Sequence, residues 1–160
     1  MLFTGEYEYT IDAKGRLAIP AEIRSWLDPQ KGGCGFYITA GPNDALWLWP
    51  ERTFERIAGA IEESLLQTEE QIEFDEITFP SARHLEMDKS GRVLLPQKMI
   101  EAAGIGSKVM ILGMRDHLEL RDPAQWEKRQ KEKLEKKSKI FYRARQAQIE
   151  KPKPQSDPEK

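Results

Sequence analysis

Asp12-Ala-Lys-Gly-Arg16-Leu-Ala-Ile-Pro20 returns 76 residues later as Asp88-Lys-Ser-Gly-Arg92-Val-Leu-Leu-Pro96. The Asp, Gly, Arg and Pro coincide, and the residues between Arg and Pro are apolar in both segments. Self-similarity at a fixed offset is typical of a structural unit that occurs more than once. The chain is therefore expected to contain two copies of one unit.

The residues around these segments follow the same order in both copies. Gly15 and Gly91 supply the positive φ that a tight hairpin requires. Pro20 and Pro96 each begin a short helical pattern, where the missing N–H costs little. A second pair of strand-like segments follows in each copy, at 36–39 and 45–49, and at 108–112 and 117–121. Each copy thus predicts strand, tight turn, strand, short helix, strand, turn and strand.

One copy of about 45 residues is too small to bury a stable core alone. The copies are therefore expected to pair around a pseudo-twofold axis, in a mainly β fold with short helices (α+β). Between them, the apolar residues from Phe54 to Leu66 predict an amphipathic helix of about four turns. The expected divisions are a first repeat at 1–53, a linking helical segment at 54–80, a second repeat at 81–125, an extended charged helix at 126–150 and a disordered tail at 151–160.

Charge is divided unevenly along the 160 residues, whose formal net charge is −2. Residues 121–160 hold 13 Lys and Arg against 7 Asp and Glu, whereas residues 1–120 hold 12 against 20. The basic C-terminal segment is either a weak contact for a phosphate backbone or a solvated charged helix. Net charge alone does not indicate a nucleic-acid partner.

Composition excludes several functional classes. The single cysteine, Cys34, rules out an intramolecular disulfide framework and a multi-cysteine zinc site. His84 and His117 lack partners for a metal site, and no acid, base or nucleophile arrangement predicts an enzyme. No segment approaches the roughly 18–20 apolar residues that span a bilayer, and no signal-peptide pattern opens the chain. A cytoplasmic protein with no membrane segment, metal or other cofactor is expected.

An Asp and an Arg four residues apart suit a rigid, charged hairpin. The Asp carboxylate can accept backbone N–H bonds within the turn and pair with the Arg. The guanidinium then projects from the mouth of the hairpin, where its planar fork can engage phosphates or the edge of guanine. The alternative is an ion pair that serves only the turn, but two such hairpins in a symmetric fold favour a DNA-binding β-ribbon.

At this point the chain resembles a known family. Gly5-Glu-Tyr-Glu-Tyr-Thr-Ile-Asp-Ala-Lys-Gly-Arg-Leu-Ala-Ile-Pro20 is similar to the opening of the bacterial MraZ family. Glu86-Met-Asp-Lys-Ser-Gly-Arg-Val-Leu-Leu-Pro96, with Ala103-Gly104-Ile105, is similar to the second repeat of that family. The resemblance covers roughly residues 1–145. It implies two SpoVT–AbrB-like domains in one chain that form a duplicated, swapped-hairpin β-barrel.

The resemblance also implies a sequence-specific DNA-binding transcriptional regulator. Members of this family act on repeated short sites upstream of the division and cell-wall gene cluster, including their own promoter, and assemble into homo-oligomeric rings of eight or more subunits. By this likeness the DNA-contacting residues are Arg16 and Arg92, assisted by Lys14 and Lys89. The turn-shaping residues are Asp12, Gly15, Asp88 and Gly91. The partner is double-stranded DNA, and the location is cytoplasmic and nucleoid-associated.

A different functional class stays open beside this one. A protein-interaction module of the same barrel type could act like an antitoxin and hold a partner with its C-terminal tail.

Overall fold

The computed structural model describes residues 2–27, 33–61 and 65–149. Two compact units divide the chain, Met1–Pro123 and Ala124–Lys160. The first unit is mainly antiparallel sheet with several short helices, which confirms the expected α+β class.

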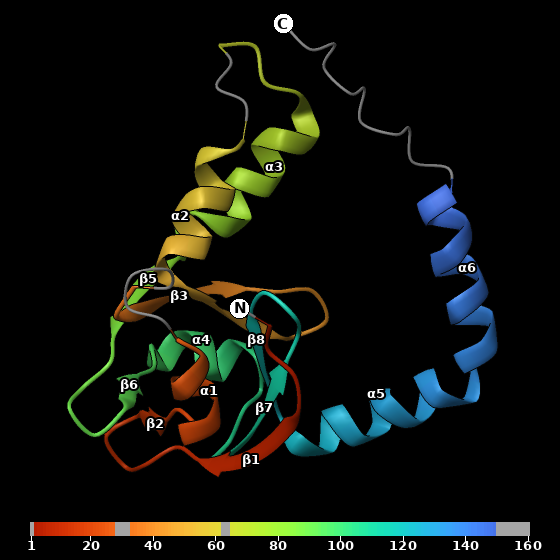
Figure 1. Ribbon diagram of the computed structural model, residues 1–160. Helices are drawn as coiled ribbons and strands as arrows, with labels where there is room; N and C mark the ends of the chain where they lie inside the picture. The colour runs from red at the N-terminus through yellow and green to blue at the C-terminus, as the bar shows by residue number, and fades with distance from the viewer. Residues whose placement is uncertain (1, 28–32, 62–64, 150–160) are drawn as a thin grey trace, which may run out of the picture. The chain divides into compact units, whose positions relative to one another are not determined.

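The elements of the first unit follow the order that the repeat predicts (Figure 1). Its strands are β1 (Glu6–Thr10), β2 (Arg16–Ala18), β3 (Gly35–Ala40), β4 (Leu46–Pro50), β5 (Arg83–Glu86), β6 (Arg92–Leu94), β7 (Lys108–Gly113) and β8 (Leu118–Arg121). Its helices are α1 (Ala21–Trp26), α2 (Glu51–Gly59), α3 (Glu69–Thr78) and α4 (Gln97–Ala102).

Among the described residues, the strands form two antiparallel sheets. Six strands pair in the order β1-β7-β8-β4-β3-β5, and β2 pairs with β6 as a separate two-stranded ribbon. The pairings cross between the sequence copies, because β1 pairs with β7 and β5 pairs with β3. The β2–β6 and β4–β8 pairs also join one copy to the other. Each half thus completes its ladders with strands of the other half, which is consistent with an open AbrB-like barrel.

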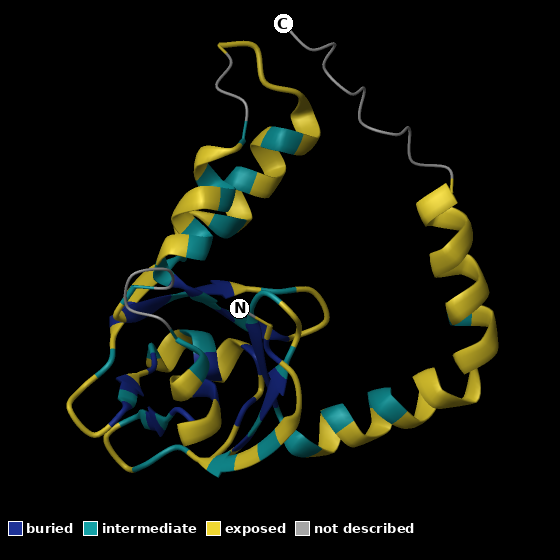
Figure 2. Ribbon diagram, in the orientation of Figure 1, coloured by how far each residue is buried: buried dark blue, intermediate teal, exposed yellow. Residues whose placement is uncertain are grey.

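The hydrophobic core is shared between the halves in the same way. Leu17 and Val93, the middle residues of the ribbon strands, are fully buried and directly paired. Figure 2 shows the buried residues concentrated on the strands, with exposed residues along α2 and α3. The largest fully buried side chains are Phe3, Leu17, Ile19, Ile23, Phe36, Ile38 and Leu48 in the first copy, and Val93, Ile111, Leu112, Leu118 and Leu120 in the second. Truncating one of them to alanine typically costs about 2–5 kcal/mol.

A buried ion pair within β8 is hydrogen-bonded to the turn between β3 and β4. Charge counting assigns Arg121 to the basic C-terminal segment, yet its side chain is buried and its Nε bonds the carboxylate of Glu119. Its Nη1 and Nη2 donate to the carbonyls of Asn43 (2.6 Å) and Pro42 (3.3 Å). Trp47 Nε1 donates to the other Glu119 oxygen at 3.2 Å. Both buried charges are therefore hydrogen-bonded. Because Arg121 also donates to two carbonyls of the turn, the network holds the turn against the sheet.

The linking segment contains two helices, α2 and α3, where the apolar spacing predicts one helix from Phe54 to Leu66. α2 ends at Gly59, and Leu66 lies outside a helix with an exposed side chain. Thr68 begins α3 by accepting a hydrogen bond from Gln71 N at 3.3 Å. An N-cap of this kind starts a new helix, and a glycine inside a helix destabilises it relative to alanine, so local signals outweigh the apolar period. Residues 62–64 of the expected helix lie outside the described residues.

The second unit contains two helices where the sequence predicts one charged helix. α5 (Pro123–Glu135) and α6 (Lys137–Ile149) are separated at Lys136, and neither has a buried residue. The expected tail at 151–160 lies outside the described residues. No helix in the described ranges combines the length and the apolar character needed to cross a lipid bilayer.

Candidate nucleic-acid interface

The first hairpin tip, residues 12–16, is organised by the carboxylate of Asp12. Its Oδ1 accepts hydrogen bonds from the backbone N–H groups of Lys14 and Arg16, both at 2.9 Å. Gly15 turns the chain with φ 80°, and its N–H donates to the carbonyl of Asp12 at 2.9 Å. A side chain there would be strained, so the glycine expected to shape this turn is required by its backbone.

The same carboxylate fixes the direction of the Arg16 side chain. Asp12 Oδ2 accepts from Arg16 Nε at 2.7 Å. Nε is one of five N–H donors of a guanidinium, and the terminal nitrogens Nη1 and Nη2 form the outer fork. Among the described residues these two nitrogens have no hydrogen-bond partner, and the Arg16 side chain is 31% exposed, so its outer donors are available to a ligand.

The second tip, residues 88–92, repeats the first atom for atom. Asp88 Oδ1 accepts from Ser90 N at 2.8 Å and Arg92 N at 3.0 Å, and Asp88 Oδ2 accepts from Arg92 Nε at 2.9 Å. Gly91 has φ 73° and donates to the Asp88 carbonyl at 2.9 Å. The Asp-x-x-x-Arg spacing thus produces one geometry twice.

These contacts lower the pKa of both carboxylates. The backbone N–H bond from Arg16 is the largest cause that lowers the pKa of Asp12, and the guanidinium adds to it. The bond from Arg92 N does the same to the pKa of Asp88. Desolvation raises both pKa values, but the hydrogen bonds and the nearby arginine lower them by more.

Each tip is fastened to the other copy of the repeat. The carbonyl of Gly15 accepts a hydrogen bond from Leu95 N, and the carbonyl of Gly91 accepts one from Ile19 N, both at 2.9 Å. The tips are therefore held by the opposite half of the fold, and their positions are defined relative to each other.

The β2–β6 ribbon places both arginines on one face. Arg16 stands opposite Leu94, Leu17 opposite Val93, and Ala18 opposite Arg92. Since side chains alternate between the faces of a strand and the middle pair is buried, the two outer pairs share the other face. Arg16 and Arg92 are diagonal neighbours on it, with backbones about 7–8 Å apart. We call this outer face, with its four residues Arg16, Ala18, Arg92 and Leu94, the ribbon face.

The predicted lysines lie at the two tips. Lys14 and Lys89 are both exposed. Their hairpin tips join the ribbon at its two opposite ends, because β2 and β6 are antiparallel. The two arginines thus lie on one face of the ribbon, and each tip carries one exposed lysine.

Two residues of this region were not identified from the sequence, Arg24 and Leu94. A Cβ built on Gly91 would lie 2.7 Å from Arg24 Nη1, so a further guanidinium lies against the second tip. The matching position of the second copy is Ile100, which is buried. Leu94 is exposed on the ribbon face. Only the pairing of the halves reveals these neighbours, because α1 and the second tip are far apart in the chain.

The residues considered for other chemistry have local partners. His84 Nε2 lies 3.2 Å from Glu51 Oε1, and His117 Nδ1 lies 2.7 Å from Asp116 Oδ1. Among the described residues, no group of three His, Cys, Asp or Glu side chains is arranged to hold a metal ion. Cys34 is exposed.

Comparison with known proteins identifies the family. The model of the MraZ family, whose description suggests an antitoxin-like protein, matches residues 2–75 and 78–148. Proteins named transcriptional regulator MraZ from Roseiflexus sp. (strain RS-1), Acetivibrio thermocellus and Finegoldia magna are 36%, 33% and 31% identical to this chain. Each match covers 79% of this chain and 85% of the relative. The chain therefore belongs to the MraZ family.

Proposed function

We propose that this chain is a transcriptional regulator that binds double-stranded DNA with its ribbon face and its two hairpin tips. The observation that supports this most strongly is the pair of guanidinium groups, Arg16 and Arg92, each anchored by its own aspartate with the outer fork open. The relatives at 31–36% identity carry the name of transcriptional regulators, which agrees with this role.

The anchored arginines suit DNA better than free side chains would. Arginine binds phosphate or the O6 and N7 atoms of guanine through two parallel N–H bonds. An arginine already fixed at Nε loses less side-chain freedom when it binds, so more of the contact energy remains as affinity. A two-stranded ribbon is also narrow enough for the major groove. In this proposal Arg16 and Arg92 contact DNA, Lys14 and Lys89 assist at the phosphates, and the aspartates and glycines of the tips shape the turns.

The acidic character of residues 1–120 requires that many such contacts act together. We propose that the chain assembles into a homo-oligomeric ring, of eight or more subunits, that binds short repeated sites upstream of the division and cell-wall genes, including its own promoter. Linked sites raise the effective concentration of each contact, so weak individual tips give a tight and selective complex. The location that follows is cytoplasmic, at the nucleoid, and the role is not enzymatic.

The test is a gel-shift titration of the full chain with DNA from upstream of its own gene. Replacement of both arginines (Arg16→Ala with Arg92→Ala) is expected to remove the shifted species. Arg56→Ala is the control, because Arg56 is exposed on α2 and carries the same charge away from the ribbon face. Unchanged binding by the double variant would refute the proposed interface.

The antitoxin-like role is the second candidate, and the description of the family model favours it. In that role α5 and α6 would hold a partner protein, since their exposed surface offers charged and apolar side chains such as Phe141 and Leu134. A stable complex with a small protein encoded nearby, together with DNA binding that ignores Arg16→Ala plus Arg92→Ala, would support this candidate over the first.

A further inference from the structure

We propose that Leu94 reads DNA sequence by contacting the C5-methyl group of thymine in the major groove. The inference rests on the proposed function and adds a base-reading side chain to a face otherwise built around cations. Three observations support it: the register of the ribbon, the exposure of Leu94, and its position beside the first tip.

The register places Leu94 on the ribbon face between the two arginines. It stands directly opposite Arg16, and Arg92 lies two residues before it on the same strand. Val93, between them, is fully buried, so Leu94 points away from the core. Leu94 is 60% exposed, although the solvent side of an antiparallel strand usually carries polar residues.

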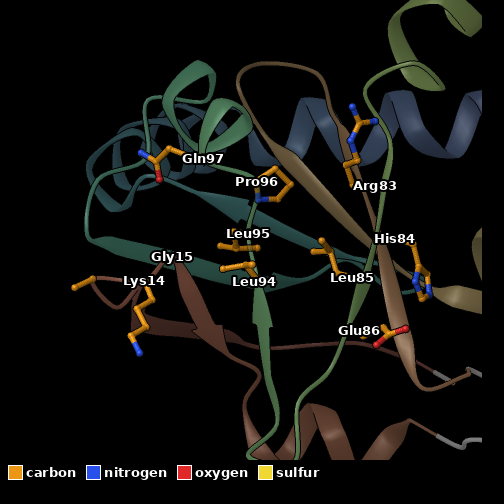
Figure 3. A pocket seen from close by; sticks show the side chains of 11 residues that line it. Lys14, Gly15, Arg83, His84, Leu85, Glu86, Leu94, Leu95, Pro96 and Gln97 are labelled. Carbon is orange, nitrogen blue, oxygen red and sulfur yellow. The ribbon is translucent and has the colours of Figure 1, made fainter.

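The side chain of Leu94 lies beside the first hairpin tip (Figure 3). A Cβ built on Gly15 would lie 3.7 Å from Leu94 Cδ1. Leu94 and Lys14 also line the same open pocket, of about 730 Å³, together with Leu95 and Pro96. An apolar side chain is therefore held next to a cationic tip, on a surface that a ligand can reach.

The chemistry of the major groove selects one partner for this leucine. The exposed tip lysines and the guanidinium donors favour DNA as the ligand of the ribbon face. The groove edge of each base pair offers hydrogen-bond donors and acceptors. Leucine has none to exchange, so contact with those groups would leave them without partners. The C5-methyl group of thymine is the apolar feature of that edge, and burying it against Leu94 is favourable.

The two halves of the ribbon differ at this position. Ala18 stands 76 residues before Leu94, at the corresponding place of the first copy. Its single methyl group ends close to the backbone and does not extend as far as a leucine. The inference therefore predicts a thymine preference at the base pair that faces Leu94. It predicts no such preference at the base pair that faces Ala18.

The experiment compares thymine with uracil, which lacks the methyl group. The probe is the duplex that the full chain enriches most strongly from a random-sequence library, prepared once with thymine and once with uracil at every T position. The chain is expected to bind the thymine duplex at least about three- to fivefold more tightly, which is the effect of one buried methyl group, and more tightly still where several subunits contact the same duplex. Leu94→Ala should abolish the preference, and Leu94→Met, which keeps an apolar side chain of similar length, should retain it.

Leu2→Ala is the matched control, because Leu2 is also 60% exposed and lies outside the ribbon. Leu2→Ala should keep the full preference for thymine. The uracil duplex also differs slightly in shape, but that difference affects both leucine variants equally, so a loss of preference only in Leu94→Ala reports the methyl contact. Equal affinity of the unaltered chain for both duplexes, or an undiminished preference in Leu94→Ala, would overturn the inference alone. Failure to enrich any duplex would overturn the proposed function and this inference with it.

Discussion

Arg16 and Arg92 are diagonal neighbours on the outer face of the β2–β6 ribbon, and each is paired to an aspartate four residues before it. Like charges on neighbouring strands destabilise a ribbon when they are unpaired. The two aspartates supply the compensating charge and also orient each guanidinium. The two arginines are therefore held in fixed orientations before a ligand binds.

Replacing the arginines by lysine separates charge from geometry. Arg16→Lys with Arg92→Lys keeps both positive charges but loses the planar fork. If the forks read guanine, affinity for the preferred duplex should fall by about 1 kcal/mol or more per residue, roughly 30-fold in total. If the arginines contact only phosphates, lysine should be nearly as good. Fluorescence anisotropy with the preferred and a scrambled duplex measures both affinities.

Arg24 should contribute through the phosphate backbone, since its guanidinium lies against the second tip. Each phosphate that a protein neutralises adds about 0.9 to the slope of log affinity against log salt. Arg24→Ala should lower that slope by about 1 and weaken all sequences alike. Arg56→Ala should leave the slope unchanged. A sequence-dependent loss for Arg24→Ala would instead assign it to base contacts.

The tip aspartates should make folding stability depend on acid. Their folded pKa values are lowered below the ordinary value near 3.9. A lowered folded pKa contributes stability that is complete above the unfolded pKa and is lost as pH falls through the folded value. Urea unfolding between pH 7 and pH 2 should show this loss, and Asp12→Asn with Asp88→Asn should reduce it. An identical pH profile in the double variant would mean that the hairpin contacts do not stabilise the fold.

Breaking the buried pair of Arg121 and Glu119 should be costly. Arg121→Ala leaves the Glu119 carboxylate buried and removes two donors from the turn carbonyls, so a loss of about 3–5 kcal/mol is expected. Arg121→Met with Glu119→Leu removes both charges and should cost less than the single change. Chemical unfolding monitored by tryptophan fluorescence, with Trp47 beside the pair, measures the difference. A single variant that is as stable as the double would contradict this account.

The repeat made most of the ribbon predictable. The Asp-x-x-x-Arg spacing, the glycine and the following proline gave hairpin, strand and helix in the observed order, because each is a local signal. The positions of Arg24 and Leu94 were not predictable, since they depend on which strand pairs with which. The same holds for Arg121, which is buried because β8 pairs with β4 and β7, and charge counting does not reveal that pairing.

The linking segment shows the opposite limit. Apolar spacing from Phe54 to Leu66 predicts one helix, because a period of 3.6 residues does not indicate where a helix is interrupted. The Thr68 cap starts the second helix and Gly59 weakens the end of the first, and both are single-residue signals within a strong periodic pattern.

The structure of the assembled protein on its preferred duplex tests the central claim most directly. The account predicts the ribbon face at the DNA, with the Nη atoms of Arg16 and Arg92 within hydrogen-bond distance, about 2.7–3.2 Å, of phosphate or guanine acceptors. A complex in which both tips are covered by neighbouring subunits, while the DNA lies on another surface, would contradict it.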